Sequence, residues 1–418
     1  MLALAPAGQA QQAEQEPPRV IPGLRLNSLS AYFGADSMWS RSAATGAGLP
    51  SVWLATGGAA ADASWLIPGR RYDAEFRYMG SYARNHRFSA LNGFDHEVSM
   101  VFRANTDRRT SFSLEASGES RLISSALFES TATLSAAQSG APIDQLAADL
   151  MDAGGLAGAA GSAIDLAVSG GRLTTGSMFA GFTHSHSPRL TLTGRVGATR
   201  ILRPSSNDPR FASMYPSMTM GIANAALSYS LSRRLQLSAS GTVTRSFSRA
   251  IPFRWETATA NLQRLIGRRS FARIEGGYAR VDGLGGSGRN SYTAGAGVGT
   301  VKGYHTVATA LRRGISDMNG AAADMSVAGE ATWAWNRPAV PWALAASAAY
   351  ERVSGSVIGR IRAWVYHATA TRRLSTNFHL AFDGAYLDAS GPGAQTFTGG
   401  GFRTSLVWTP APVQETPR

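Results

Sequence analysis

Apolar and polar residues alternate along most of this chain, in segments of about 10–13 residues that repeat from near residue 71 onward. In the segment 94–103 one face carries Phe94, Val98, Met100 and Phe102, and the other carries Asp95, Glu97, Ser99 and Arg103. Successive side chains of a β-strand point to opposite faces, so each segment is predicted to be a strand with one apolar and one polar side. Repetition of this pattern without intervening helices is typical of a transmembrane β-barrel.

The spacing of these segments predicts how many strands the barrel has. Sixteen segments alternate, at 71–83, 94–105, 110–121, 174–186, 189–201, 216–231, 235–247, 254–265, 270–281, 291–302, 304–314, 324–335, 342–353, 358–371, 376–388 and 398–409. The segments 24–35 and 52–65 form a further candidate pair. We therefore predict an all-β fold, a transmembrane antiparallel up-and-down β-barrel of 18 strands. The alternative has 16 strands, with 24–70 as a plug or a periplasmic extension.

Short and long connections alternate between these segments without a break. Bacterial barrels have short periplasmic turns and longer outer loops. The short connections, many of which contain arginine, are therefore placed at the periplasmic rim: 106–109, 187–188, 232–234, 267–269, 302–303, 337–341 and 372–375. The longer ones are placed outside the cell: 84–93, 122–173, 202–215, 247–253, 282–290, 314–323, 353–358 and 389–397.

Two segments depart from simple alternation. In 216–231 the apolar positions change phase after Met220, which predicts a bulge near Asn224. In 358–371 both faces carry large residues, so the pattern gives that strand no orientation.

Composition favours strands as the only means of crossing a membrane. The chain is 44% hydrophobic and 16% charged, and no run approaches the ~20 apolar residues that a spanning helix requires. A membrane form must then satisfy its backbone polar groups through closed strands. The chain contains no cysteine, which excludes disulfides and thiolate metal sites.

The two ends of the chain are expected to lie outside the barrel. Residues 1–22 look like the end of a truncated secretory signal peptide followed by a disordered leader rich in Gln, Glu and Pro. The barrel is predicted over 23–409, and 410–418 is predicted to be a periplasmic tail.

The formal net charge of +13 comes almost entirely from arginine, because Lys302 is the only lysine. Nucleic-acid binding is not indicated, since no helix-turn-helix, zinc finger or aromatic RNA-binding motif accompanies the charge. Much of the surplus falls in the short turns, where arginine side chains can reach lipid head groups while their stems cover apolar surface.

Charged residues on the polar faces of the strands are candidates for lining a pore. An Arg or Lys on the lipid face near the membrane midplane costs roughly 2–4 kcal/mol, so these residues are predicted to face a lumen. A barrel of this size leaves room for water. The predicted pore-lining residues carry both signs, which argues against strong anion selectivity: Glu75, Arg77, Glu97, Arg103, Glu115, Arg195, Arg273, Glu275 and Arg403. The outer loops are expected to add Arg200, Arg203, Arg210, Arg249, Arg254 and Arg289, which favours an acidic glycan near the mouth.

No motif predicts catalysis or a bound cofactor. Gly283–Gly288 matches a dinucleotide-binding pattern, but no helix follows it to hold a pyrophosphate, so it is interpreted as a loop. His184 and His186 share a strand face without a carboxylate nearby in sequence, which favours a histidine pair at the membrane interface over a metal site. We predict no enzyme activity, no metal and no cofactor.

Three features together resemble bacterial outer-membrane β-barrel proteins of the porin-like class. They are the alternation in Phe94–Arg103, the arginine-bearing turns, and the segment Phe402–Trp408. The last of these is similar to the terminal strand that the outer-membrane assembly machinery recognises, although residues 409–418 follow it here. The resemblance covers about 24–409, and a narrower likeness is to barrels that export exopolysaccharide.

The resemblance implies a location in the bacterial outer membrane, with that assembly machinery, outer-membrane lipid and lipopolysaccharide as partners. It also implies a channel that gives passive passage to hydrophilic solutes or to an acidic exopolysaccharide. Export of a polysaccharide would require a separate periplasmic polysaccharide-export protein. The alternative is a structural or adhesion barrel that acts through its extracellular loops without conductance.

The longest predicted loop, 122–173, is the third outer loop in the count of 18 strands. In porins the third outer loop folds inward and narrows the pore. By this resemblance, Asp144, Asp149 and Asp152 would face a constriction. The alternatives are an amphipathic cap over the mouth, a lid that binds a partner, or a disordered loop.

Overall fold

The computed structural model describes residues 24–41, 48–69, 71–85, 92–122, 172–205, 217–247, 252–282, 289–317, 323–354, 360–390 and 396–410. These residues form strands joined by turns. In chain order the strands are β1 (Leu24–Arg41), β2 (Gly48–Pro68), β3 (Tyr72–Asn85), β4 (Gly93–Asn105), β5 (Thr110–Leu122), β6 (Arg172–Ser187), β7 (Leu190–Ser205), β8 (Met218–Ser232), β9 (Leu235–Ser246), β10 (Arg254–Ile266), β11 (Ser270–Asp282), β12 (Arg289–Lys302), β13 (His305–Asp317), β14 (Ala323–Asn336), β15 (Trp342–Ser354), β16 (Arg360–Arg373), β17 (Phe378–Ser390) and β18 (Thr396–Trp408).

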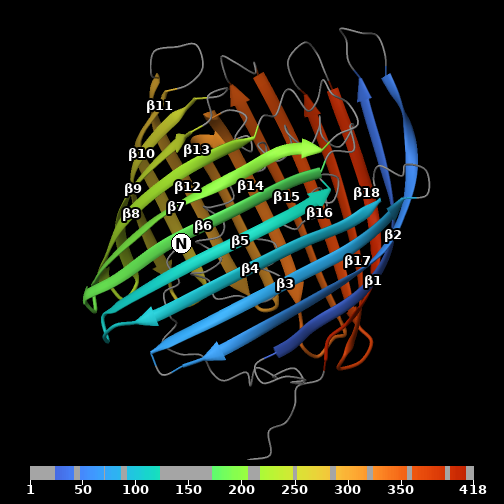
Figure 1. Ribbon diagram of the computed structural model, residues 1–418, viewed down its shortest axis with the longest axis horizontal. Coiled ribbons are helices and arrows are strands. Elements are labelled where there is room, and N and C mark those ends of the chain that lie inside the picture. Colours follow the sequence, from blue (N-terminus) through green and yellow to red (C-terminus); the bar gives the residue numbers. More distant parts are fainter. Residues whose placement is uncertain are drawn as a thin grey trace, which may run out of the picture.

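Each strand pairs with its neighbours in sequence, and the first strand pairs with the last. The sheet has 18 strands, and the β1–β18 pairing closes it (Figure 1). Both β1–β2 and β1–β18 are antiparallel, with Phe33 opposite Gly57 on one side and Thr404 on the other. The predicted antiparallel barrel and its strand count are therefore confirmed, and the segments 24–35 and 52–65 belong to the wall rather than to a plug.

The two faces of the sheet can be told apart by burial. Large apolar side chains such as Phe33, Phe182 and Tyr386 are exposed, and they share one face. Fully buried strand residues such as Thr244 and Val353 lie on the opposite face. Only the inner face of a closed barrel is enclosed, so the buried face is the inner one and the apolar face is the outer one. An apolar exterior on closed strands is how a barrel crosses the outer membrane.

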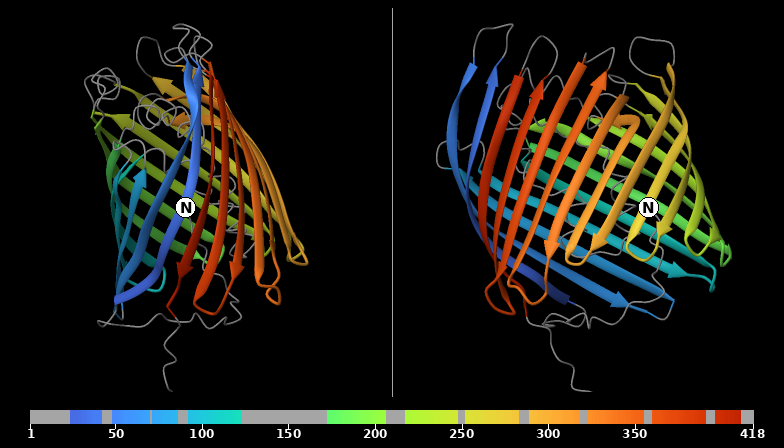
Figure 2. Two further views of the ribbon diagram at one scale, coloured as in Figure 1. Left: turned by 90° about the vertical axis from the view of Figure 1, so that its right-hand side faces the viewer. Right: turned by 180° about the vertical axis from the view of Figure 1, so that it is seen from behind.

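Tight turns join the strands at one end of the barrel, which is the lower end in Figure 2. Gly267 and Gly303 adopt φ values of 71° and 62° there, a left-handed backbone that other residues rarely adopt. In the β4–β5 turn the Asp107 carboxylate accepts hydrogen bonds from the backbone N–H groups of Arg109, at 2.6 Å, and Thr110, at 2.7 Å. These bonds hold the pKa of Asp107 below its usual value, and the bond from Arg109 contributes most.

The structure corrects the bulge that the sequence predicts near Asn224. The β7–β8 register runs without a shift from Leu190 opposite Tyr229 to Ile201 opposite Met218. The phase change in sequence arises because Met218 and other apolar side chains near the long-loop end of β8 face inward and are buried. The only shift in the described β8–β9 pairing lies between Ser230 and Ser232.

The structure also orients β16, which the sequence left open. Trp364 and Tyr366 lie on the outer face, 40% and 42% exposed, and Val365 is buried on the inner face. Four arginines expected in outer loops instead belong to strands: Arg200, Arg203, Arg254 and Arg289. The other two, Arg210 and Arg249, lie outside the described residues. Within the described residues, no helix is long and apolar enough to cross a membrane.

Candidate functional site: the charged inner wall

The inner face of the barrel has two regions of different character. On β2–β7 it carries ionised side chains, most of which are well exposed, and we call this region the charged wall: Asp62, Asp73, Glu75, Arg77, Glu97, Arg103, Glu115 and Arg195. On β11–β17 most inward side chains are small and buried, and we call this region the buried wall. Its members include Phe271, Ala308, Thr332, Ala334, Ala345, Ser347, Ala349, Glu351, Val353, Ala363, Val365, His367, Leu387 and Ala389.

Arg77 is held at the charged wall by a two-point contact with Asp62 on β2. Its Nε donates to Asp62 Oδ1 at 3.0 Å, and its Nη2 donates to Oδ2 at 2.8 Å. Asn27 adds a third donor to the same carboxylate, at 3.1 Å. Glu75 and Glu97 lie on the same face, two positions along β3 and diagonally across on β4. The planar guanidinium suits such bidentate pairing and fixes the orientation of Arg77.

Arg103 and Asp73 form a second pair nearer the short-turn end of the same wall. The Arg103 Nη1 to Asp73 Oδ2 distance is 3.2 Å, and the two residues face each other across β4 and β3. Their side chains are 53% and 35% exposed. An ion pair this exposed adds about 0–1 kcal/mol to stability, so it contributes little to holding the barrel together.

Arg195 on β7 lies between a carboxylate and an aromatic ring. Its Nη2 is 2.6 Å from Glu115 Oε2 on β5, and its Cζ is 3.9 Å from the ring centroid of Phe179 on β6. A Cβ at Gly197 would collide with the Met178 carbonyl oxygen and with the Phe179 ring, so glycine is required at that position. The ring and the carboxylate together fix the guanidinium on the inner face.

The remaining predicted pore residues also lie on the inner face. Arg273 and Glu275 on β11 are 3.7 Å apart, but with side chains only 18% and 13% exposed they belong to the buried side of the barrel. Arg403 on β18 stacks over the ring of Tyr32 at 4.5 Å and lies opposite Asp383 in register. The predicted constriction residues Asp144, Asp149 and Asp152 lie outside the described residues, as does the loop Gly283–Gly288.

The exposure of the charged wall indicates a lumen that contains water. The Arg77, Glu115 and Arg195 side chains are 47%, 41% and 45% exposed. They point inward in a closed barrel, so the solvent that reaches them lies inside the barrel. The wall carries both signs in neighbouring pairs, so it presents local charge without a strong net field.

Sequence reasoning missed several members of both walls. The alternation around Trp65 places Asp62 on the inner face and could have identified it. Phe179 gives no such signal, because it is an apolar residue at an inward position. The carboxylates of the buried wall were also missed: Glu330 accepts a hydrogen bond from Thr332 Oγ1 at 3.1 Å, and Glu351 is 1% exposed.

The two histidines singled out in sequence lie near the short-turn end of β6. His184 Nδ1 is 3.0 Å from Thr110 Oγ1, and the rings of His184 and His186 are 6.4 Å apart. Among the residues that the structure describes, no three His, Asp or Glu side chains converge as metal ligands. The charged wall has no such cluster among the described residues, and its chemical groups are ion pairs.

No protein family model matches the chain, and no curated protein sequence matches it. Among solved structures, Pseudomonas aeruginosa OccK2 (OpdF) aligns with a TM-score of 0.49 and 10% identity, covering 91% of this chain and 97% of that one. Its complex with glucuronate aligns with a TM-score of 0.49 and 9% identity, covering 91% and 98%. Acinetobacter baumannii OccAB4 aligns with a TM-score of 0.46 and 7% identity, covering 91% and 97%.

These similarities concern the shape of the fold, and the ligands of those proteins do not transfer to this chain. The chain's own architecture is that of a porin-like barrel of the bacterial outer membrane. Its antiparallel strands close on themselves, its exterior is apolar, and short turns gather at one rim.

Proposed function

We propose that this protein is a passive outer-membrane channel for small hydrophilic solutes, which pass along the charged wall. The observation that carries the proposal is the solvent exposure of inward ionised side chains in a closed barrel, above all those of Glu115 and Arg195. Exposed ionised groups on an inner wall are available to water and solute, since they keep their solvation and can interact with a passing charge.

The charged wall acts as a filter of modest strength. A solute passing Glu115 and Arg195 meets one negative and one positive group within 2.6 Å of each other, so neither sign of charge is strongly favoured. Because both groups are exposed, they can exchange partners with a passing solute at small energetic cost. Weak ion selectivity is therefore expected, in line with the mixed signs along the wall.

Reversal potentials across a planar bilayer in a salt gradient test this function. Wild-type protein is expected to conduct with a small reversal potential. Arg195→Gln leaves Glu115 unbalanced and should shift permeability toward cations, whereas Glu115→Gln should shift it toward anions. Each shift is expected to be roughly two- to sixfold, the Boltzmann factor of the about 0.5–1 kcal/mol that a unit charge exerts at about 4–8 Å in water. The two variants are matched controls, because each removes one charge from the same pair.

The outcomes separate this function from the alternative one. Shifts of opposite sign support a channel whose permeant ions pass Glu115 and Arg195. Conductance without either shift would mean that ions avoid the charged wall. Absence of conductance in the wild type would contradict the channel and favour a structural or adhesion barrel. Passage of an acidic exopolysaccharide, with a periplasmic export partner, has no specific support among the described residues.

A further inference from the structure

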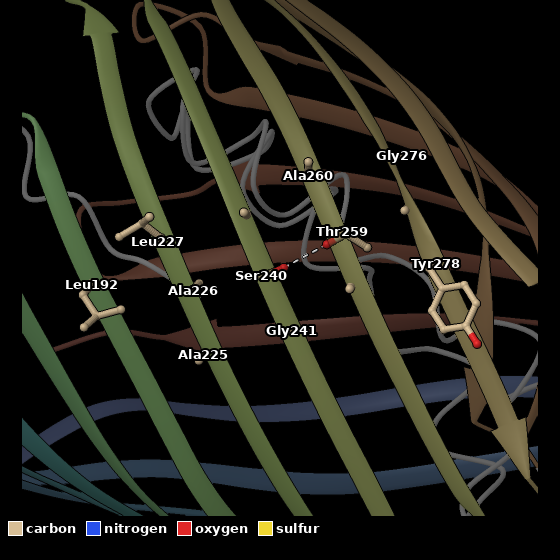
Figure 3. Close-up of a pocket in the computed structure, with 13 residues that line it drawn as sticks. Leu192, Ala225, Ala226, Leu227, Ser240, Gly241, Thr259, Ala260, Gly276 and Tyr278 are labelled. Carbon is tan, nitrogen blue, oxygen red and sulfur yellow. Dashed lines mark hydrogen bonds between the residues drawn. The ribbon is translucent and has the colours of Figure 1, made fainter.

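The outer surface of the barrel carries an open apolar groove over β7–β11. It has a volume of about 700 Å³, within the range of small-molecule sites, and small residues form its floor (Figure 3). Ala225, Gly241 and Ala258 are neighbours in register across three strands of this floor. Leu192 and Leu227 stand at one side and Tyr278 at the other, all on the membrane-facing surface. The groove lies on the face opposite the charged wall, so the proposed channel does not use it.

Four arginines lie on the same outer face, near the long-loop end of these strands. They are Arg200 on β7, Arg245 on β9, Arg254 on β10 and Arg280 on β11. Only two described carboxylates share this patch: Glu256 pairs with Arg254, and Asp282 lies 3.2 Å from Arg280. Neither Arg200 nor Arg245 has an ion-pair partner among the described residues. We call Arg200, Arg245, Arg254 and Arg280 the rim arginines.

Two of the rim arginines face each other directly across strands. Arg245 is opposite Arg254 in the β9–β10 register. Like charges directly opposite in a sheet are destabilising unless an anion lies between them. The patch therefore has excess positive charge at a position where a phosphate would compensate it.

The distance between the patch and the groove matches an amphiphile. Arg245 and Arg254 lie four residues along their strands from Gly241 and Ala258, which are opposite each other in the same register. At about 3.3 Å per residue this is roughly 13 Å, measured from the membrane rim toward the bilayer interior. A charged head group at the rim would thus have its hydrocarbon chain directly over the groove.

We propose that this wall binds one molecule of lipopolysaccharide from the outer leaflet, with a phosphate on the rim arginines and an acyl chain in the groove. The placement of the long loops at the outer rim puts the arginines at the level of outer-leaflet phosphates. Charge complementarity favours this occupant over a second copy of the chain, which would have to bring carboxylates to Arg200 and Arg245 although the chain has a formal net charge of +13.

The test measures lipopolysaccharide binding to delipidated full-length barrel in detergent. Arg200→Gln/Arg245→Gln removes two charges without leaving a described carboxylate unpaired, and should weaken binding about 25-fold at about fivefold per charge. Arg264→Gln is its control, because Arg264 lies on the outer face of β10 at the opposite rim. Gly276→Leu should also weaken binding, since a Cβ at Gly276 meets no atom within 4 Å and the longer side chain would fill the groove.

The groove variant has a control of the same kind on another wall. Gly384 lies on the outer face of β17, where a Cβ makes only ordinary contacts at 3.9 and 4.0 Å. Gly384→Leu should therefore leave binding unchanged. Equal binding by wild type and both test variants would overturn the proposal. So would a dimer that buries this wall and excludes lipid, detected by cross-linking through Gly276→Cys. Conductance is measured separately, so failure here does not bear on the channel.

Discussion

The charged wall and the buried wall are built from the same alternation, yet their inward side chains meet different surroundings. On the charged wall, Glu115 and Arg195 remain 41% and 45% exposed while only 2.6 Å apart. On the buried wall, Val353 and Glu351 are each 1% exposed. Alternation thus tells which face a residue is on, but it does not tell whether that face meets water.

The difference has consequences for what each wall can do. Exposed ion pairs are worth little to stability but can respond to a passing charge. Buried small residues contribute to stability instead and are not available to a passing charge. Close packing makes the stability of the barrel sensitive to any volume or charge added at these positions. We therefore propose that the charged wall selects solutes and the buried wall stabilises the barrel, and the predictions below test this division.

The largest effect is expected from adding a charge to the buried wall, compared with adding the same charge to the charged wall. Val353→Asp places an unpaired carboxylate at a buried position and should destabilise the barrel by about 3–5 kcal/mol. Ser99→Asp adds the same charge on the charged wall, beside Arg77 in register, and should change stability little. Urea unfolding of barrels in lipid vesicles measures both. A similar cost for the two substitutions would remove the distinction between the walls.

A smaller effect is expected from exchanging the charges of one exposed pair. Glu115→Arg/Arg195→Glu keeps the pair but reverses its direction. Since an exposed pair contributes about 0.2–1 kcal/mol, unfolding should differ from wild type by less than that, and the reversal potential should return close to the wild-type value. Loss of folding in this double variant would show instead that the charged wall carries stability.

The smallest effect concerns the turn that joins two strands of the charged wall. Asp107 has a lowered pKa in the folded state, so its stabilising bonds are present above its ordinary value of 3.8 and are lost as the pH falls through the folded pKa. The melting temperature of Asp107→Ala should therefore lie slightly below that of wild type at pH 7, and the gap should close below pH 3.8. If the difference in melting temperature between Asp107→Ala and wild type did not depend on pH, the Asp107 carboxylate would be ruled out as its source.

Much of this fold could be predicted because a two-residue period constrains each strand independently. The strand count, the direction of each strand and the inward face of Arg77 and Arg195 follow from alternation and turn length alone. The buried wall could not be predicted in this way, since inward Val365 is apolar and looks like an outward residue, as does inward Met218 on β8. The same ambiguity produced the mistaken bulge near Asn224 and left β16 without an orientation.

Candidate site residues were predictable only where charge broke an apolar pattern. The carboxylate of Glu115 and its partner Arg195 stood out for this reason. Their contact could not be foreseen, because Glu115 and Arg195 are two strands apart and Phe179 lies between them. The role of Asp144, Asp149 and Asp152 in a constriction stays a prediction.

Cysteine accessibility tests the division of labour between the two walls most directly. The chain has no cysteine, so a single one reports without background. Ser117 is exposed on the inner face of β5, and Ser347 is 6% exposed on the inner face of β15. A charged, water-soluble thiol reagent should modify Ser117→Cys and lower its single-channel conductance, while Ser347→Cys stays unmodified and conducts as before. Equal modification of both, or block through Ser347→Cys alone, would contradict a solute path along the charged wall.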